Sequence, residues 1–126
     1  MSALPGSSRP ASWPWPASLD ALVAAPRHHT LLLETDRVRV LDTRIPPGEM
    51  VPVHTHRWPG VLYVLSRSAF VRRDAEGHVL LDTRAAGSPA SEHPVIWSER
   101  LPPHSLENVG AVEIRVISIE LKDVAA

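Results

Sequence analysis

The sequence predicts an all-β fold, a barrel or sandwich of short antiparallel strands, and two observations carry this prediction. Thirteen prolines divide the 126 residues into short segments, most of which alternate apolar and polar residues or run apolar for a few positions. Only one segment, SLDALVAA at residues 18–25, has a helical pattern. Short strands separated by proline and glycine turns are typical of sandwiches and barrels.

The chain is predicted to begin with an irregular arm over residues 1–17, which are rich in proline, serine and alanine. Trp13 and Trp15 each precede a proline, and this favours an extended backbone at both positions. We expect the two indoles to pack on the domain or on a second subunit. The alternative is a mobile leader.

Residues 18–126 are predicted to form one domain, because the chain is too short for two domains of ordinary size. Ser18 is expected to cap a short helix that ends before Pro26. Strands follow at residues 30–35, 38–45, 60–65, 94–97 and 112–121, with a hairpin at 75–77 in which Gly77 is the left-handed residue and a loop at 84–93.

Two strands allow a prediction about facing. In residues 38–45 we expect Val38, Val40 and Ile45 to point inward. In residues 112–121 the apolar positions change from even to odd numbers. We therefore predict a β-bulge near residues 116–117.

Composition excludes several classes of function. The net charge is −1, so no electrostatic attraction to nucleic acid or to an anionic membrane is expected. The chain has no cysteine, which excludes disulfides, thiolate metal sites and cysteine nucleophiles. The N-terminus lacks a signal-peptide pattern, and no window approaches the roughly 18 apolar residues of a membrane span. We expect a cytoplasmic protein.

The residues most suited to chemistry are histidines. His54 and His56 are two positions apart in a predicted strand, so both rings point to the same face and can bind one metal ion. A third ligand has to come from elsewhere, and His104, which follows the Pro102-Pro103 pair, is the best candidate. The alternative is a barrel that has lost its metal and keeps polar remnants.

These residues resemble the two motifs of the cupin family. Gly48, His54 and His56 match the first motif, G-x5-H-x-H-x3-E-x6-G, and His104 with Asn108 matches the end of the second, P-x-G-x2-H-x3-N. The resemblance covers roughly residues 30 to 122. It implies a cupin-type jelly-roll β-barrel, a metal held by the three histidines, and a homodimer.

The sequence departs from these motifs at several positions. Gly60 stands where the family has its glutamate ligand, and Arg67 replaces the last glycine of the first motif. In the second motif Glu99 and Leu101 stand at the proline and glycine positions, and the Pro102-Pro103 pair can substitute as the turn.

A site of three neutral histidines keeps the full charge of a divalent ion and leaves coordination positions open. Such a site suits Fe(II) oxygen chemistry, and it also suits zinc hydrolysis. Within the cupins, the missing acid resembles the thiol dioxygenases and the diketone-cleaving dioxygenases, in which the substrate chelates the iron. We therefore expect Fe(II), with Zn, Mn and Ni as alternatives.

The remaining assignments concern the pocket and the other charged residues. Candidate substrate-binding residues are Arg57, Gly60, Met50, Leu62, Leu106 and Trp97, while Asn108 is expected to support a ligand or a turn. Tyr63 is expected outside the barrel. His28, His29, His78 and His93 are interpreted as titrating surface residues, and Arg72-Arg73 with Asp74 and Glu76 as a solvated hairpin tip.

The resulting hypothesis is a metal-binding cupin that acts as a non-haem Fe(II) dioxygenase on a small chelating anionic substrate. Gly60 would leave room for oxygen or for that substrate. One alternative is a non-catalytic cupin that binds a metal or a small ligand. Another is a metal-dependent isomerase or hydrolase.

Overall fold

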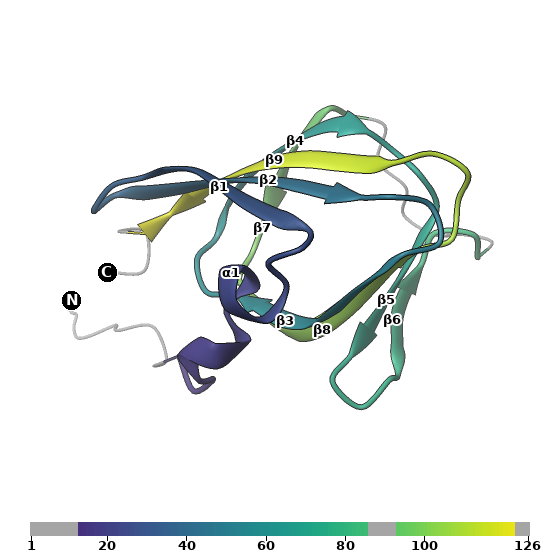
Figure 1. Cartoon of the computed structure of the whole chain (residues 1–126), viewed down its shortest axis with the longest axis horizontal. Helices are drawn as coiled ribbons and strands as arrows, with labels where there is room; N and C mark the ends of the chain where they lie inside the picture. Colours follow the sequence, from purple (N-terminus) through teal and green to yellow (C-terminus); the bar gives the residue numbers. More distant parts are fainter. Residues whose placement is uncertain (1–12, 86–92, 123–126) are drawn as a thin grey trace.

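Two antiparallel sheets form the molecule, as seen in a computed structural model that describes residues 13–85 and 93–122 (Figure 1). The five-stranded sheet has the order β1 (His29–Glu34), β2 (Val38–Ile45), β9 (Ile114–Leu121), β4 (Gly60–Ser66) and β7 (Val95–Ser98). The four-stranded sheet has the order β3 (Met50–His56), β8 (Leu101–Asn108), β5 (Phe70–Asp74) and β6 (Val79–Asp82). The predicted all-β jelly roll is confirmed.

The short N-terminal helix differs in detail from the prediction. A 3-10 turn, Ala17–Leu19, is followed by one turn of α-helix, α1 (Ala21–Ala24). Asp20 caps α1 in place of Ser18, because its carboxylate accepts a hydrogen bond from the Leu22 amide at 3.0 Å. No described helix is long and apolar enough to cross a membrane.

Part of the predicted arm lies outside the described residues, and so does most of the predicted loop at 84–93. Within the described part, the Trp13 and Trp15 rings pack edge to face with centroids 4.7 Å apart, and both side chains are partly buried. The hairpin between β5 and β6 is confirmed, with Gly77 at a φ of 91°. Pro102 and Pro103 lie within β8 and do not form a turn.

The predicted facing is right for Ile45 of β2, which is buried, and wrong for Val38, Val40 and the end of β9. The two strands pair in one continuous register with no bulge at residues 116–117. Arg39 and Leu41 are buried on β2, whereas Val40 is only partly buried and pairs with Ile119, which is 36% exposed. The inward side chains of β9 stay at even-numbered positions along the whole strand. The last two of them, Ser118 and Glu120, are polar and line the cavity described below.

A bulge does occur on β3, where it decides which residues face inward. Val51 pairs with Leu106 and His54 pairs with His104, so three residues on β3 span two on β8. The extra residue changes the parity of the strand. Val51 and His54 are both buried, whereas Met50 is 53% exposed.

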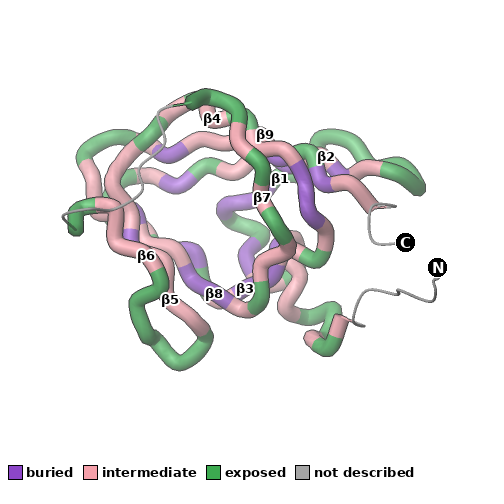
Figure 2. The backbone as a smooth tube through the Cα atoms, turned by 180° about the vertical axis from the view of Figure 1, so that it is seen from behind, coloured by how far each residue is buried: buried purple, intermediate pink, exposed green. Residues whose placement is uncertain are grey.

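The core and the cavity share their side chains. Ala25, Ile45, Val51 and Ile114 form the buried cluster, against which Phe70, Leu106 and Val116 pack. Figure 2 shows buried segments on the inner side of both layers. Several of these apolar side chains also line the cavity between the sheets, so the core is its floor.

Candidate metal centre

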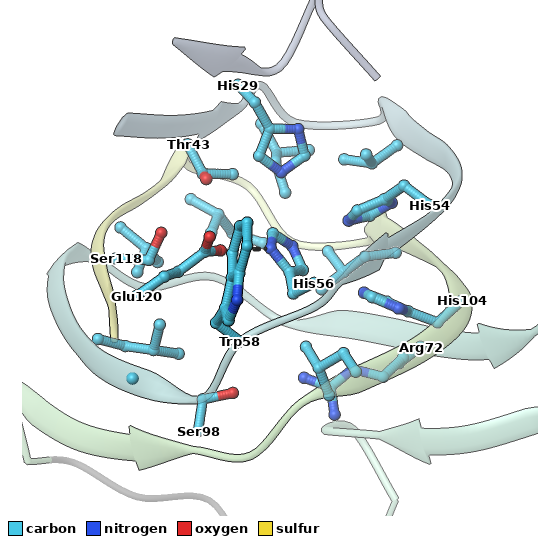
Figure 3. A pocket seen from close by; sticks show the side chains of 18 residues that line it. His29, Thr43, His54, His56, Trp58, Arg72, Ser98, His104, Ser118 and Glu120 are labelled. Atoms are coloured by element: carbon cyan, nitrogen blue, oxygen red, sulfur yellow. Dashed lines mark hydrogen bonds and ion pairs between the residues drawn. The ribbon is translucent and has the colours of Figure 1, made fainter. Parts of the chain in front are cut away.

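Four histidine rings meet in a cavity of about 120 Å³ between the two sheets (Figure 3). His29 begins β1, His54 and His56 lie on β3, and His104 lies on β8. The ring centroid of His54 is 4.9 Å from that of His29, 5.0 Å from that of His56 and 4.3 Å from that of His104. One ring nitrogen from each of His29, His54 and His56 lies within 4.8 Å of the other two, so this group contains His29 and not the predicted third ligand, His104.

The Nδ1 atom of each of these rings faces a hydrogen-bond acceptor. His54 donates to the Pro52 carbonyl and His104 to the Pro102 carbonyl, both at 2.8 Å. His29 donates to the Ala25 carbonyl at 3.0 Å, and His56 donates to the Glu120 carboxylate at 2.8 Å. Carbonyl and carboxylate oxygens only accept, so each neutral ring carries its proton on Nδ1. All four Nε2 lone pairs are thus available to a metal.

Burial keeps three of these rings neutral. Desolvation lowers the pKa of His29 and of His104 to about 4, and that of His54 to about 2. The mutual repulsion of the clustered rings acts in the same direction, while the hydrogen bonds to backbone carbonyls oppose it. Neutral imidazole is the form that binds metals.

The prediction of surface positions for His28 and His29 is wrong: the His29 side chain is 5% exposed and lines the cavity. His28 is equally buried, with its Nε2 2.9 Å from the Glu49 carboxylate. The sequence signal was weak, since it consisted of two adjacent histidines directly before a strand. Only the pairing of β1 with β2, which places His29 opposite Thr43, brings the ring to the cluster.

A buried chain of charged groups holds the His56 ring. Glu120 accepts from His56 through one oxygen and from Arg39 Nε through the other, at 2.9 Å. The remaining guanidinium nitrogens of Arg39 donate to both oxygens of Asp20, the residue that caps α1. The Arg39 guanidinium also lies 5.0 Å from the centre of the Trp58 ring. The single acid on the described cavity wall therefore has both oxygens engaged.

Gly60 lies in the cavity wall, but the structure gives a different reason for the missing side chain. A Cβ at this position would lie 2.1 Å from the Ile119 carbonyl oxygen and 2.9 Å from the Glu120 Cα. The close approach of β4 to β9 thus requires glycine. Gly60 pairs directly with Glu120, so a carboxylate is still present beside this position, on the neighbouring strand.

Two polar groups in the cavity wall have no hydrogen-bond partner among the described residues. They are the Arg72 Nε atom and the Ser118 hydroxyl, and both are buried. Burial lowers the pKa of the Arg72 guanidinium, with no carboxylate to offset the effect. The prediction that Arg72 belongs to a solvated hairpin tip is wrong, because its side chain is on the inner face of β5.

The structure separates the predicted pocket residues into two groups. Leu62 and Leu106 line the cavity together with Gly60. Met50 is 53% exposed and lies outside the cavity because of the β3 bulge. Trp97 is 51% exposed and also lies outside, on the outer face of β7, where its indole donates to Glu99 at 2.7 Å. Arg57 is also exposed and outside the cavity wall.

Asn108 has a structural role, and its hydrogen bonds go to the backbone of other segments and not to the four histidines. It is fully buried, and its amide nitrogen donates to the carbonyls of Ile45 and Val112, both at 2.8 Å. Its side-chain oxygen accepts from the Gly110 amide at 3.0 Å. The side chain therefore fixes the turn between β8 and β9. Tyr63, at 46% exposure, faces away from the cavity.

Comparison with known proteins supports the fold. No protein-family model and no curated protein sequence matches the chain. Among solved structures, a cupin domain from Bordetella pertussis is similar over 93% of this chain and 99% of its own, with a TM-score of 0.58 and 19% identity.

Two further structures agree with this one. An RmlC-like cupin family protein from Methanocaldococcus jannaschii has a TM-score of 0.52 and 12% identity over 78% of this chain and 86% of its own. A protein with a double-stranded β-helix domain from Klebsiella pneumoniae has a TM-score of 0.50 and 20% identity over 78% of this chain and 74% of its own. The chain therefore shares the double-stranded β-helix fold of these structures.

Proposed function

We propose that the chain binds one divalent metal ion through the Nε2 atoms of His29, His54, His56 and His104. The observation that supports this most strongly is the common orientation of the four rings, since every Nδ1 atom is engaged by an acceptor. Such acceptors fix the tautomer and orientation of histidines that bind metals. Neither surface exposure nor core packing requires four clustered histidines to share the same tautomer, whereas binding of one metal ion through their Nε2 atoms does.

The donor set narrows the choice of metal. Four imidazoles without thiolates suit Fe, Zn, Cu and Ni better than Mg or Ca, which prefer oxygen ligands. In an octahedral ion, four histidines leave two positions for other ligands. We propose Fe(II), which when bound supplies these open positions and the electrons for oxygen chemistry.

The reaction that we propose is oxygenation of a small anionic substrate that chelates the metal. Hydrolases and isomerases commonly use a side chain that moves protons, such as a carboxylate, a lysine or a free histidine. In the described cavity wall the only acid is Glu120, and both of its oxygens are engaged by His56 and Arg39. A chelating substrate needs no such base, because the metal orients it.

Metal analysis of anaerobically purified protein tests the site. Wild type is expected to hold one iron per chain, and alanine substitution of each of the four histidines should lower this content. His93→Ala is the matched control, because His93 is exposed and does not line the cavity, whereas His78 lies with Asp74 and Glu76 in a second group of possible metal ligands. If wild type holds no more metal than the His54→Ala, His104→Ala double variant, the site does not exist. If only His29→Ala keeps full affinity, the site has three histidine ligands.

Oxygen uptake tests the reaction. The iron-loaded protein is expected to consume oxygen with chelating acids or β-diketones, and the His54→Ala variant is not. Turnover with zinc in place of iron would instead indicate a hydrolase or isomerase. Metal and ligand binding without turnover under any metal would show a binding module.

A further inference from the structure

Arg72 occupies a position from which it can contact a ligand of the metal centre. On β5 it lies opposite Leu106 of β8, and paired residues of antiparallel strands share a face. Leu106 lines the cavity, and so does Arg72. Figure 3 shows the guanidinium beside His104, on the side of the cavity away from His29. The side chain therefore reaches the cavity from the four-stranded sheet.

The other arginines near this site already have carboxylate partners. Arg39 is paired with Asp20 and Glu120, and Arg73, the chain neighbour of Arg72, donates to Glu107 at 3.0 Å. Arg72 makes no ion pair with any described residue, and its Nε atom is buried without a hydrogen bond. Its guanidinium carbon instead lies 5.9 Å from the centre of the Phe70 ring. Arg72 is partly buried, and a charge withdrawn from water without a carboxylate partner is unfavourable, so this guanidinium is suited to bind an anion.

The charges of the cavity wall point to the same kind of ligand. The four imidazoles that face it are neutral when they bind a metal, and the negative charge of Glu120 is matched by Arg39. A divalent ion and Arg72 would leave the cavity with a surplus of positive charge. An anion that touches both groups would reduce this surplus at both ends.

We propose that Arg72 binds the carboxylate of a small ligand whose other polar group coordinates the metal. The inference rests on the proposed function and adds the substrate class. A planar guanidinium matches a carboxylate through two parallel hydrogen bonds. The cavity of about 120 Å³ has room for a small ligand, since an engineered cavity of about 150 Å³ binds benzene. The ligand is thus a short carboxylate with a second donor group.

Malonate is a suitable probe, and malonamide is its neutral analogue. Calorimetric titration of the anaerobic iron-loaded protein is expected to show malonate binding in wild type. Arg72→Gln should weaken this binding by about 10- to 100-fold, the usual effect of losing a buried hydrogen bond to a charged group. Arg73→Gln, the neighbouring control, should leave it unchanged, and malonamide should bind to none of these proteins. Iron content should be equal in all three.

The outcomes separate this inference from the metal site. Equal malonate affinity in wild type and Arg72→Gln, with iron bound in both, overturns the proposed role of Arg72 and leaves the metal site intact. If wild type holds no iron, the metal site fails, and titration of the metal-free proteins still compares the two arginine variants. If wild type binds malonate neither in the iron-loaded nor in the metal-free form, the proposed role of Arg72 is overturned. Tighter, Arg72-dependent binding of inorganic phosphate overturns the assignment to a carboxylate.

Discussion

Gly60 stands at the position where the cupin motif has its acidic ligand. Glu120 lies directly opposite Gly60 on the neighbouring strand. The structure explains why the acid cannot stand at position 60: the backbone of β9 occupies the space that a Cβ would need. The carboxylate of Glu120 instead orients His56 from behind. The cavity therefore keeps an acid, but as the hydrogen-bond partner of His56, one of the proposed metal ligands.

Glu120→Gln should weaken metal binding by about 10- to 100-fold, the usual effect of losing the partner of a ligating histidine. A neutral amide accepts a weaker hydrogen bond from His56 and leaves Arg39 without one of its two carboxylates. Competition with a chromogenic chelator measures the affinity. Glu107→Gln, which changes an ion pair outside the cavity wall, is the control. Unchanged affinity in Glu120→Gln would exclude this role.

The metal-free protein should lose stability as the pH falls from 6.5 toward 4. His29 and His104 have pKa values near 4 in the folded chain and near 6.5 when unfolded, so the unfolded chain binds more protons in this range. Each ring then costs up to about 1.4 kcal/mol per pH unit. Above pH 6.5 both rings are neutral in the folded and in the unfolded chain, so this loss of stability does not occur.

Urea denaturation at pH 7.5, 6.5 and 5.5 measures this dependence. His104→Gln should reduce the slope, whereas Arg57→Gln, at an exposed position outside the cavity wall, should keep it. A free energy of unfolding that is constant over this range would show that the rings are not held neutral by burial.

At the residue scale, spacing in the sequence was enough to bring three histidines together. His54 and His56 needed only strand periodicity, and His104 needed a family motif. His29 and Arg72 could not be found in this way, because no local pattern distinguishes them from surface residues. Their positions depend on which strands become neighbours, β1 with β2 and β5 with β8.

At the scale of the elements, the sequence predicted where strands occur better than which way they face. The inward positions of β9 include Ser118 and Glu120, which are polar because they belong to the site. A reading that assigns apolar residues to the interior therefore reverses the end of this strand. The same assumption reversed Val38 and Val40 on β2, and the bulge on β3 displaced Met50.

The contact between β4 and β9 gives a prediction about one element. Gly60→Ala should lower the free energy of unfolding by about 1–3 kcal/mol or more, since its Cβ would meet backbone atoms that cannot rotate away. Chemical denaturation measures the loss. Leu65→Ala, an exposed position on the same strand, should change stability much less. A fully stable Gly60→Ala variant would mean that β9 moves aside, and a larger residue could then be tolerated there.

At the scale of the whole molecule, the two sheets together build a site that neither contains alone. β3 and β8 bring three of the histidines, while the five-stranded sheet adds His29 and Glu120. The sequence indicated the jelly roll through its short strands and histidine spacing. It could not give the contacts between the sheets, because these depend on pairings between residues far apart in the chain.

The outer face of the five-stranded sheet carries an apolar row with one residue from each strand. Its members are paired in succession across the sheet, in the order Leu33, Val40, Ile119, Val61 and Trp97. Leu33 is 53% exposed and Trp97 51%. Exposed apolar patches of this kind mark interaction surfaces.

We propose that a second copy of the chain covers this row, because a row centred on the middle strand can meet its own copy about a two-fold axis. Wild type should then be a dimer by light scattering, and Ile119→Lys, at the centre of the row, should be a monomer with unchanged metal content. Val23→Lys adds the same charge at an exposed position on α1 and should remain a dimer. A monomeric wild type at micromolar concentration, or a dimeric Ile119→Lys variant, would exclude this face as the interface.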